Sequence, residues 1–249
     1  MTEVNKVNYM KQKALIVWGG WDGHEPDKVA AIFNRTLKAE GFEVRVSDSL
    51  ESFADQKALT EMDLIIPIWT MGEIDSKYVV NISEAVANGT GLAGCHGGMC
   101  DAFRKDVLWQ FLTGGNWVAH PGGDGVEYPV NIRNSSSSLV EGIEDFNVKS
   151  EQYYLHVDPV VETLATTPFP QARWYHSSNG HVDMPVVWTK KWAVGRVFYN
   201  ALGHVASVFE VPQALELMRR GFLWAAEGKK FSREKGLSSK LYHGETKNF

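Results

Sequence analysis

The sequence predicts an α/β fold in which a parallel β-sheet has helices packed on both faces. In the first half, short apolar runs stop at glycine or polar residues, and segments with the apolar spacing of a helix separate them. Strands that alternate with helices in this way form a parallel sheet with right-handed crossovers. In the second half, strand-like runs follow one another with only turns between them, so we expect strand-rich insertions there.

Four apolar runs predict the strands of the parallel sheet, at residues 13–18, 43–46, 63–69 and 91–95. Proline, glycine and capping residues mark where the helices begin and end. The helices are expected over residues 26–40 and 57–61, from Asp75 or Ser76 to Gly89, and over residues 99–112.

The second half predicts strands at residues 126–133, 147–153, 160–165, 186–188 and 196–200, with a hairpin connection at 190–195. A helix begins at Pro212, and the serines at 135–138 predict a surface loop. The polar segment 229–249 is expected to be frayed or to lie as an arm on a neighbouring subunit. We expect residues 1–249 to form a single domain, with residues 1–11 as an N-terminal extension.

Composition excludes several classes of protein. The 249 residues are 44% hydrophobic and include 9 Trp, which rules out a disordered or fibrous chain. The 25 basic and 30 acidic residues give a net charge of −5, so no nucleic acid or membrane partner is expected. No apolar stretch approaches the ~20 residues that span a bilayer, and the first residues lack a signal peptide. With only Cys95 and Cys100, the sequence predicts a soluble, reduced, cytoplasmic protein.

Ligands of open parallel sheets bind beyond the carboxyl ends of the strands. Three loops follow strands at that position, at residues 19–24, 69–73 and 94–98, and the first and third contain a histidine. The glycines of the first loop lack the G-x-G-x-x-G spacing, so no nucleotide cofactor is expected.

The strongest signal is the Gly-Cys-His-Gly-Gly segment at 94–98, between a strand and a helix. Glycines on both sides of one polar residue suit a tight strand-to-helix elbow, in which His96 points into the cleft. Strand alternation then turns Cys95 into the core, which disfavours a cysteine nucleophile. At a helix N-terminus the imidazole stays neutral, which suits a metal ligand, a hydrogen-bond donor or a general base. The alternative is a histidine bonded only to its own elbow.

Other histidines lie next to predicted strands. We expect His24, His96 and His204 to converge in one cleft, with His120 and Glu151 as the next candidates. Histidines and one glutamate from separate loops commonly build a zinc or iron site, although each one alone serves equally well as a structural residue. We expect His176, His181 and His243 to be exposed to solvent.

Several of these segments together resemble the ThuA-like, trehalose-utilisation family. They are Gly-Gly-Trp-Asp-Gly-His-Glu-Pro at 19–26, His-Gly-Gly at 96–98, His-Pro at 120–121, Glu-Gln-Tyr-Tyr at 151–154, Gly-Arg-Val-Phe-Tyr at 195–199 and Leu-Gly-His at 202–204. Residues 219–225 are similar to the closing helix of the family. The resemblance runs from residue 13 to 228 and implies a flavodoxin-like, class I glutamine amidotransferase-like fold without the amidotransferase cysteine. It also implies sugar catabolism near 3-keto-glycosides made by a partner dehydrogenase.

The resemblance favours an enzyme that acts on an oxidised sugar by hydrolysis, elimination or isomerisation. A keto group acidifies the neighbouring C–H bond, so the site needs a base and an electrophile that holds the enediolate. A divalent metal would be that electrophile, and zinc is the metal we expect. Glu151 or a histidine would be the base. The candidate metal ligands are His24, His96, His120 and His204.

Substrate contacts are expected from Trp21, Asp22, Trp69, Arg104, Tyr153 and His156. Core packing is the alternative for the aromatic residues, and a solvated helix face for the arginine. Two other functions stay open: a non-catalytic sugar or metabolite-binding protein on a retired amidotransferase fold, and a glutamine amidotransferase with a reactive Cys95 thiolate. We also expect a homo-oligomer.

Overall fold

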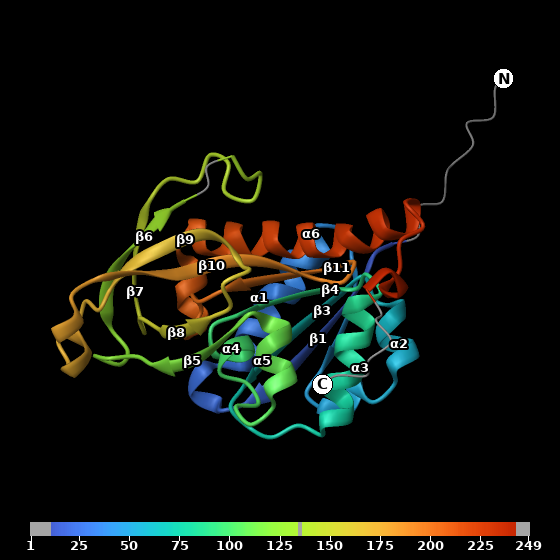
Figure 1. The fold of residues 1–249 in the computed structure, drawn as a ribbon, viewed down its shortest axis with the longest axis horizontal. Helices are drawn as coiled ribbons and strands as arrows, with labels where there is room; N and C mark the ends of the chain where they lie inside the picture. Colours follow the sequence, from blue (N-terminus) through green and yellow to red (C-terminus); the bar gives the residue numbers. More distant parts are fainter. Residues whose placement is uncertain (1–10, 134–135, 243–249) are drawn as a thin grey trace.

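The computed structural model describes residues 11–133 and 136–242, and a nine-stranded sheet runs through them (Figure 1). Five strands pair in parallel in the order β2 (Glu43–Ser47), β1 (Lys13–Gly20), β3 (Leu64–Thr70), β4 (Gly91–Cys95) and β11 (Gly195–Asn200). The sheet continues with antiparallel pairs through β10 (Val182–Trp192), β9 (Glu162–Phe169), β6 (Val126–Ile132) and β7 (Phe146–Ser150). Two further strands, β5 (Gly115–Ala119) and β8 (Tyr154–Val157), pair with each other.

The predicted parallel sheet is confirmed, because β1 to β4 all pair in parallel. Helices cover both of its faces, which is why its central strands are continuous apolar runs. On one face lie α1 (Pro26–Ala39) and α6 (Pro212–Glu234), which also contact each other. On the other lie α3 (Ser76–Ala87) and α5 (Val107–Thr113), with α2 (Gln56–Glu61) against α3 (Figure 1). No helix in the described part of the chain is long and apolar enough to cross a bilayer.

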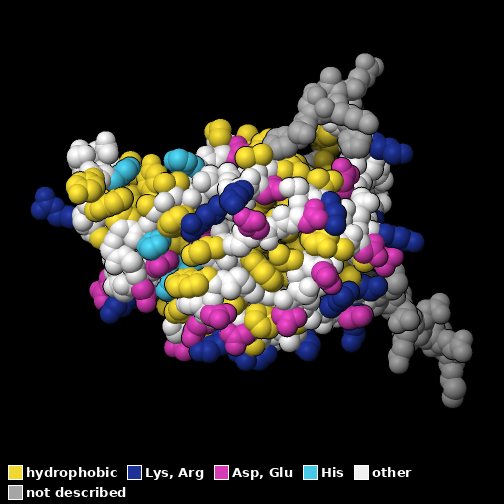
Figure 2. Space-filling model, turned by 90° about the horizontal axis from the view of Figure 1, so that it is seen from below, with side chains coloured by type: hydrophobic (Ala, Val, Ile, Leu, Met, Phe, Trp, Pro, Cys, Tyr) yellow, Lys and Arg dark blue, Asp and Glu magenta, His cyan; other side chains and the backbone are white. Residues whose placement is uncertain are grey.

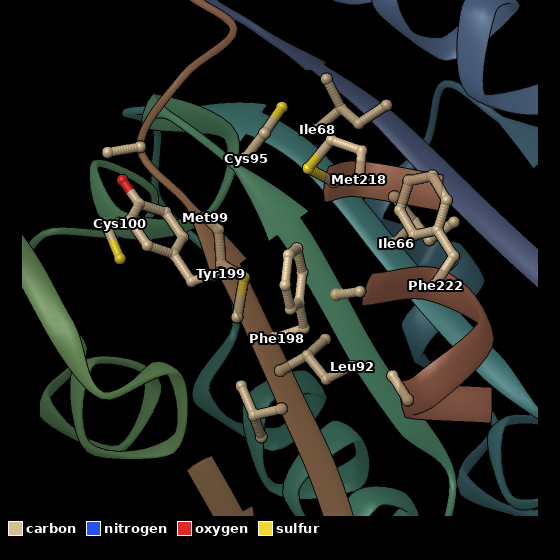
Figure 3. Packing of buried hydrophobic residues seen from close by; sticks show 14 of the residues in the cluster. Ile66, Ile68, Leu92, Cys95, Met99, Cys100, Phe198, Tyr199, Met218 and Phe222 are labelled. Atoms are coloured by element: carbon tan, nitrogen blue, oxygen red, sulfur yellow. The ribbon is translucent and has the colours of Figure 1, made fainter. Parts of the chain in front are cut away.

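The core between α6 and the sheet is closely packed (Figure 3). Phe222 of α6 lies edge-to-face against Phe33 of α1, with ring centroids 4.9 Å apart. Gly221 lets α6 approach β11, since a Cβ there would lie 2.3 Å from the ring of Phe198. Cys95 belongs to the same core, among apolar side chains, as strand alternation predicts (Figure 3).

The prediction of a single helix over residues 99–112 is wrong. The chain forms a short helix α4 (Gly97–Cys100), leaves the helical path, and starts α5 at Val107. The intervening backbone pairs with the loop after β3: the N–H of Met71 donates to the carbonyl of Asp101, and that of Phe103 donates to the carbonyl of Met71. Asp106 then caps α5 by accepting the N–H of Trp109. These long-range backbone bonds replace the helical bonds that the apolar spacing suggests.

The strand-rich second half is confirmed, but several boundaries differ. Strand β7 ends at Ser150, so residues 151–153 leave the sheet, and the strand predicted through residue 153 is too long. Strands β5 and β8 were not predicted, and β10 is much longer than residues 186–188 because it pairs along both edges.

The predicted polar tail begins too early. Helix α6 continues to Glu234, and Lys229 is buried, with its ammonium group donating to the carbonyl oxygens of Thr60 and Met62 at the end of α2. Burial lowers the pKa of Lys229 to about 8. The Ser136 and Ser138 side chains are exposed, as expected of a surface loop. The expectations for residues 1–10, Ser135 and the tail over 243–249, including His243, lie outside the described residues.

Replacing Lys229 with Met is expected to lower the free energy of unfolding by about 1–3 kcal/mol, because buried carbonyl oxygens lose their donor. Urea denaturation measures the effect. The matched control is Lys230→Met, since the Lys230 side chain is 69% exposed and pairs only loosely with Glu234. Equal stability of the two variants would contradict a structural role for the buried lysine.

Candidate metal centre and active site

Four buried side chains meet at the carboxyl end of the parallel strands. His24 follows β1, His96 follows β4, His204 follows β11, and Glu151 comes directly after β7. Each offers one ligand atom, and these atoms all lie within 4.8 Å of one another. The three histidines therefore meet in one place, as their positions after parallel strands predict. We call these four residues the His/Glu cluster.

His96 occupies the strand-to-helix elbow that the glycines predict. Its φ of 46° is a strained conformation for a residue other than glycine. The flanking glycines are needed for space: a Cβ at Gly97 would lie 2.8 Å from the His24 ring, and one at Gly98 would lie 2.9 Å from the Ile68 backbone. Burial raises the pKa of the Cys95 thiol to about 12, so it does not offer the reactive thiolate of a glutamine amidotransferase.

The Glu151 carboxylate is surrounded by imidazoles. Its Oε2 atom lies 3.2 Å from Nε2 of His96, 3.3 Å from Nδ1 of His204 and 3.9 Å from Nε2 of His24. The other oxygen, Oε1, lies 3.6 Å from Nδ1 of His120. Thus three histidines face one oxygen of the carboxylate and a fourth faces the other.

The protonation states follow from burial and charge. Burial and the neighbouring imidazoles lower the pKa of His24 to about 3, and burial lowers the pKa of His96. Burial alone would raise the pKa of Glu151, but the neighbouring imidazoles, His204 foremost, oppose it and hold that pKa well below its usual range. At neutral pH the carboxylate is ionised, while His24 and His96 are neutral.

One neutral histidine, His96, presents a lone pair to the carboxylate. Nδ1 of His96 lies 2.8 Å from the carbonyl oxygen of Ala201, which can only accept, so Nδ1 carries the proton and Nε2 has a lone pair. That lone pair faces a carboxylate oxygen at 3.2 Å, an arrangement that a cation between the two atoms would make favourable. Three imidazole nitrogens and one carboxylate oxygen are a common ligand set for zinc and iron. The cluster therefore fits a divalent metal.

Partners outside the cluster hold the ligands in place, and the sequence analysis missed them. Nδ1 of His24 is hydrogen-bonded to Oγ1 of Thr70 at 2.7 Å, and Oδ1 of Asp124 lies 3.9 Å from Nε2 of His204. The Glu25 carboxylate accepts the N–H of Ala206 at 3.1 Å, which joins the loop of His24 to that of His204. Such outer partners fix ring orientation in metal sites. Only long-range pairing reveals them, so no local motif could have found them.

Two of the predicted substrate contacts lie beside the cluster. The Tyr153 ring stacks on the His96 ring, with centroids 3.9 Å apart, and the half-exposed Trp21 ring lies 4.8 Å from the His24 ring. Arg104 contacts residues outside the cluster. It pairs with the buried Asp101, and its guanidinium lies 4.4 Å from the centroid of the Trp117 ring.

The three other residues predicted to contact the substrate make no hydrogen bond, ion pair or ring contact with the cluster in the described part of the chain. Alternation along β8 buries Leu155 and exposes His156, which lies against Tyr154 and away from the four residues. Asp22 is exposed in the short helix η1 (Asp22–His24). Trp69 packs over the backbone of Gly19. The expected solvation of His176 is also wrong, because its ring lies half-buried 4.7 Å from that of Tyr154.

Comparisons with known proteins identify the family. The chain matches a family model named ThuA and described as trehalose utilisation over residues 13–225, while no curated protein matches it. Its fold is similar to a ThuA-like protein from Bacteroides uniformis ATCC 8492, with 18% identity, a TM-score of 0.72 and coverage of 97% of this chain and 100% of that chain. It is also similar to a ThuA-like protein from Parabacteroides merdae ATCC 43184, with 19% identity, a TM-score of 0.69 and coverage of 88% and 91%. At these identities the structural likeness shows the fold alone. Because the family model spans most of the sequence, the chain belongs to the ThuA, trehalose-utilisation family.

Proposed function

We propose that this protein is a metal-dependent enzyme of sugar catabolism that acts on an oxidised (3-keto) glycoside, such as a keto derivative of trehalose. The proposal depends on one observation: three buried histidines surround the buried Glu151 carboxylate, and His96 presents a lone pair to it at 3.2 Å. Membership of the trehalose-utilisation family supports sugar as the substrate class. Zinc is the metal that we favour, because three nitrogens and one oxygen are typical of its sites.

The chemistry begins with the proton next to the keto group, and its removal leads to elimination, hydrolysis or isomerisation. A bound metal would supply a Lewis acid that polarises the keto oxygen. It would be held by His24, His96 and His204, with Oε2 of Glu151 as the fourth ligand.

We assign the base to His120. Its Nδ1 lies 3.6 Å from Oε1 of Glu151, so His120 stands beside the cluster without being one of its four members. Its side chain is 36% exposed, unlike the buried cluster, and it lines a hollow of about 460 Å³ that a sugar can enter. Tyr153, stacked on His96, and Trp21 restrict the entry of water around the ligands.

A sugar-binding protein without turnover is the alternative function. An aromatic pocket without titratable groups would favour this alternative. The four histidines around Glu151 instead favour an enzyme. We also propose that the protein works in the cytoplasm, since both free cysteines are buried thiols that suit a reducing compartment.

Elemental analysis and a turnover assay test the proposal together. The purified protein is expected to carry about one divalent metal ion per chain, with zinc the most abundant. It is expected to consume 3-keto-trehalose, to lose this activity on chelation and to regain it with Zn²⁺. The control variant His156→Ala is expected to keep both metal and activity. Metal without turnover would favour the sugar-binding alternative, and protein that binds no metal would refute the metal-dependent mechanism.

Metal removal is also expected to lower thermal stability. A ligand bound only by the folded state and present at about 100 times its Kd stabilises by about 2.7 kcal/mol, which for a chain of this size lowers Tm by about 5–10 °C when it is removed. Differential scanning calorimetry with and without chelator measures this shift. The double variant His24→Ala/His204→Ala is expected to show no chelator-dependent shift, and a shift as large as that of the parent protein would place the metal elsewhere.

A further inference from the structure

Two adjoining hollows lie outside the His/Glu cluster. The inner hollow, of about 460 Å³, is lined by His120, Trp117, Arg173 and Trp174. The outer hollow, of about 550 Å³, is lined by Arg173, Trp174, Tyr175 and His181. Because both contain Arg173 and Trp174, the two hollows meet at these residues. His120 connects the inner one to Glu151.

The lining of the outer hollow has the chemistry that a sugar ring requires. Trp174 is 55% exposed and Tyr175 is 86% exposed, which is unusual for large aromatic side chains. Their ring centroids lie 5.6 Å apart. A pyranose presents C–H groups on its faces, which pack on aromatic rings, and hydroxyls on its rim, which need hydrogen-bond partners. Arg173 lines both hollows and can supply N–H donors to these hydroxyls.

The segment that carries these residues is fixed to the site. Gln152, the neighbour of Glu151, is buried, and its Oε1 accepts the N–H of Gln171 at 2.9 Å. Further along, the N–H of Trp174 donates to Oγ of Ser177, and the N–H of Ser177 donates to the carbonyl oxygen of Trp174. At the end of the molecule that holds this segment, hydrophobic and histidine side chains lie together (Figure 2). The exposed rings are therefore held at a set distance from the cluster.

We propose that the substrate has two rings: the oxidised ring occupies the inner hollow beside His120, and the second ring stacks on Trp174 in the outer hollow, with hydroxyls toward Arg173. This inference rests on the proposed function and adds to it the place where the second ring binds. Both volumes fall in the range of small-molecule sites, which is about 300–1,000 Å³.

Binding to metal-free protein tests the inference without any need for turnover. Calorimetric or NMR titration compares trehalose, which has two rings, with methyl α-glucoside, which has one. Trp174→Ala is expected to weaken trehalose binding about tenfold and to leave methyl α-glucoside binding unchanged. The control is Phe231→Ala on α6, which removes an aromatic side chain of similar exposure (47%) far along the sequence.

The outcomes separate this inference from the proposed reaction. Equal weakening of both sugars, or no weakening of trehalose, would overturn the second-ring site while metal-dependent turnover stands. The tenfold selective loss would support the site even if no keto-glycoside is consumed. Sedimentation of the parent and variant proteins gives the remaining outcome. If Trp174→Ala dissociates an oligomer, Trp174 lies in an interface with a second copy of the chain, and the proposal is overturned.

Discussion

Replacing His96 with Ala is expected to abolish turnover of a 3-keto-glycoside, whereas Cys95→Ala is expected to retain most of it. His96 holds the outward position of the elbow and contacts Glu151 at 3.2 Å, while Cys95 is buried in the apolar core. Loss of a group that acts on the reacting centre costs about 10²–10⁴ in rate. Loss of the sulfur leaves a small cavity, which costs on the order of 1–2 kcal/mol of stability.

The two adjacent positions serve as controls for each other. Thermal melts establish that both variants are folded, and elemental analysis shows whether His96→Ala has lost the metal. A folded, inactive Cys95→Ala protein beside an active His96→Ala protein would make the thiol the reactive group. The amidotransferase-like mechanism would then replace the metal-dependent one.

Replacing Glu151 with Gln is expected to remove most of the metal and to lower the rate by about 10³-fold. The change keeps the shape of the side chain and removes the charge that balances a divalent cation. It also replaces an acceptor by an amide whose N–H can donate to the lone pair of His96, so the metal-free variant is expected to be at least as stable as the metal-free parent. Gain of stability with loss of activity is the pattern of a functional site.

Three measurements on Glu151→Gln separate function from structure: keto-glycoside turnover, metal content, and Tm in the presence of chelator. Glu127→Gln is the control, since it makes the same chemical change at an exposed position on β6. If Glu151→Gln keeps its metal and its rate, the carboxylate is not a ligand. If it unfolds, the interpretation that the carboxylate faces lone pairs is wrong.

The parts of the fold predicted correctly are those whose signal is local. Strands β1, β3 and β4 are buried on both faces, so their sequences are continuous apolar runs that end at glycine or at a polar residue. The elbow at His96 also has a local signal in its glycines, although the space that they provide is needed by distant segments: a Cβ at Gly97 would meet His24, and one at Gly98 would meet Ile68. Histidines placed after parallel strands then meet, because the sheet brings these strand ends to one edge.

The parts predicted wrongly depend on pairing between distant segments. The spacing of residues 99–112 suits a helix, but backbone bonds between Asp101, Phe103 and Met71 end it. Whether Tyr153 or His156 faces the site is decided by where β7 stops and where β8 pairs with β5, and a shift of one residue reverses the answer. The support that Thr70 and Glu25 give to two of the ligands has the same long-range origin.

The position of β11 has a consequence for synthesis of the protein on the ribosome. This strand comes last in the sequence among the described strands, yet it lies in the middle of the sheet, between β4 and β10. Until residues 195–204 have emerged, the parallel strands and the antiparallel strands are two separate pieces with open edges that can pair with other chains. His204 is also missing from the nascent chain until then. The protein therefore acquires the last residue of its His/Glu cluster and the continuity of its sheet in the same late step.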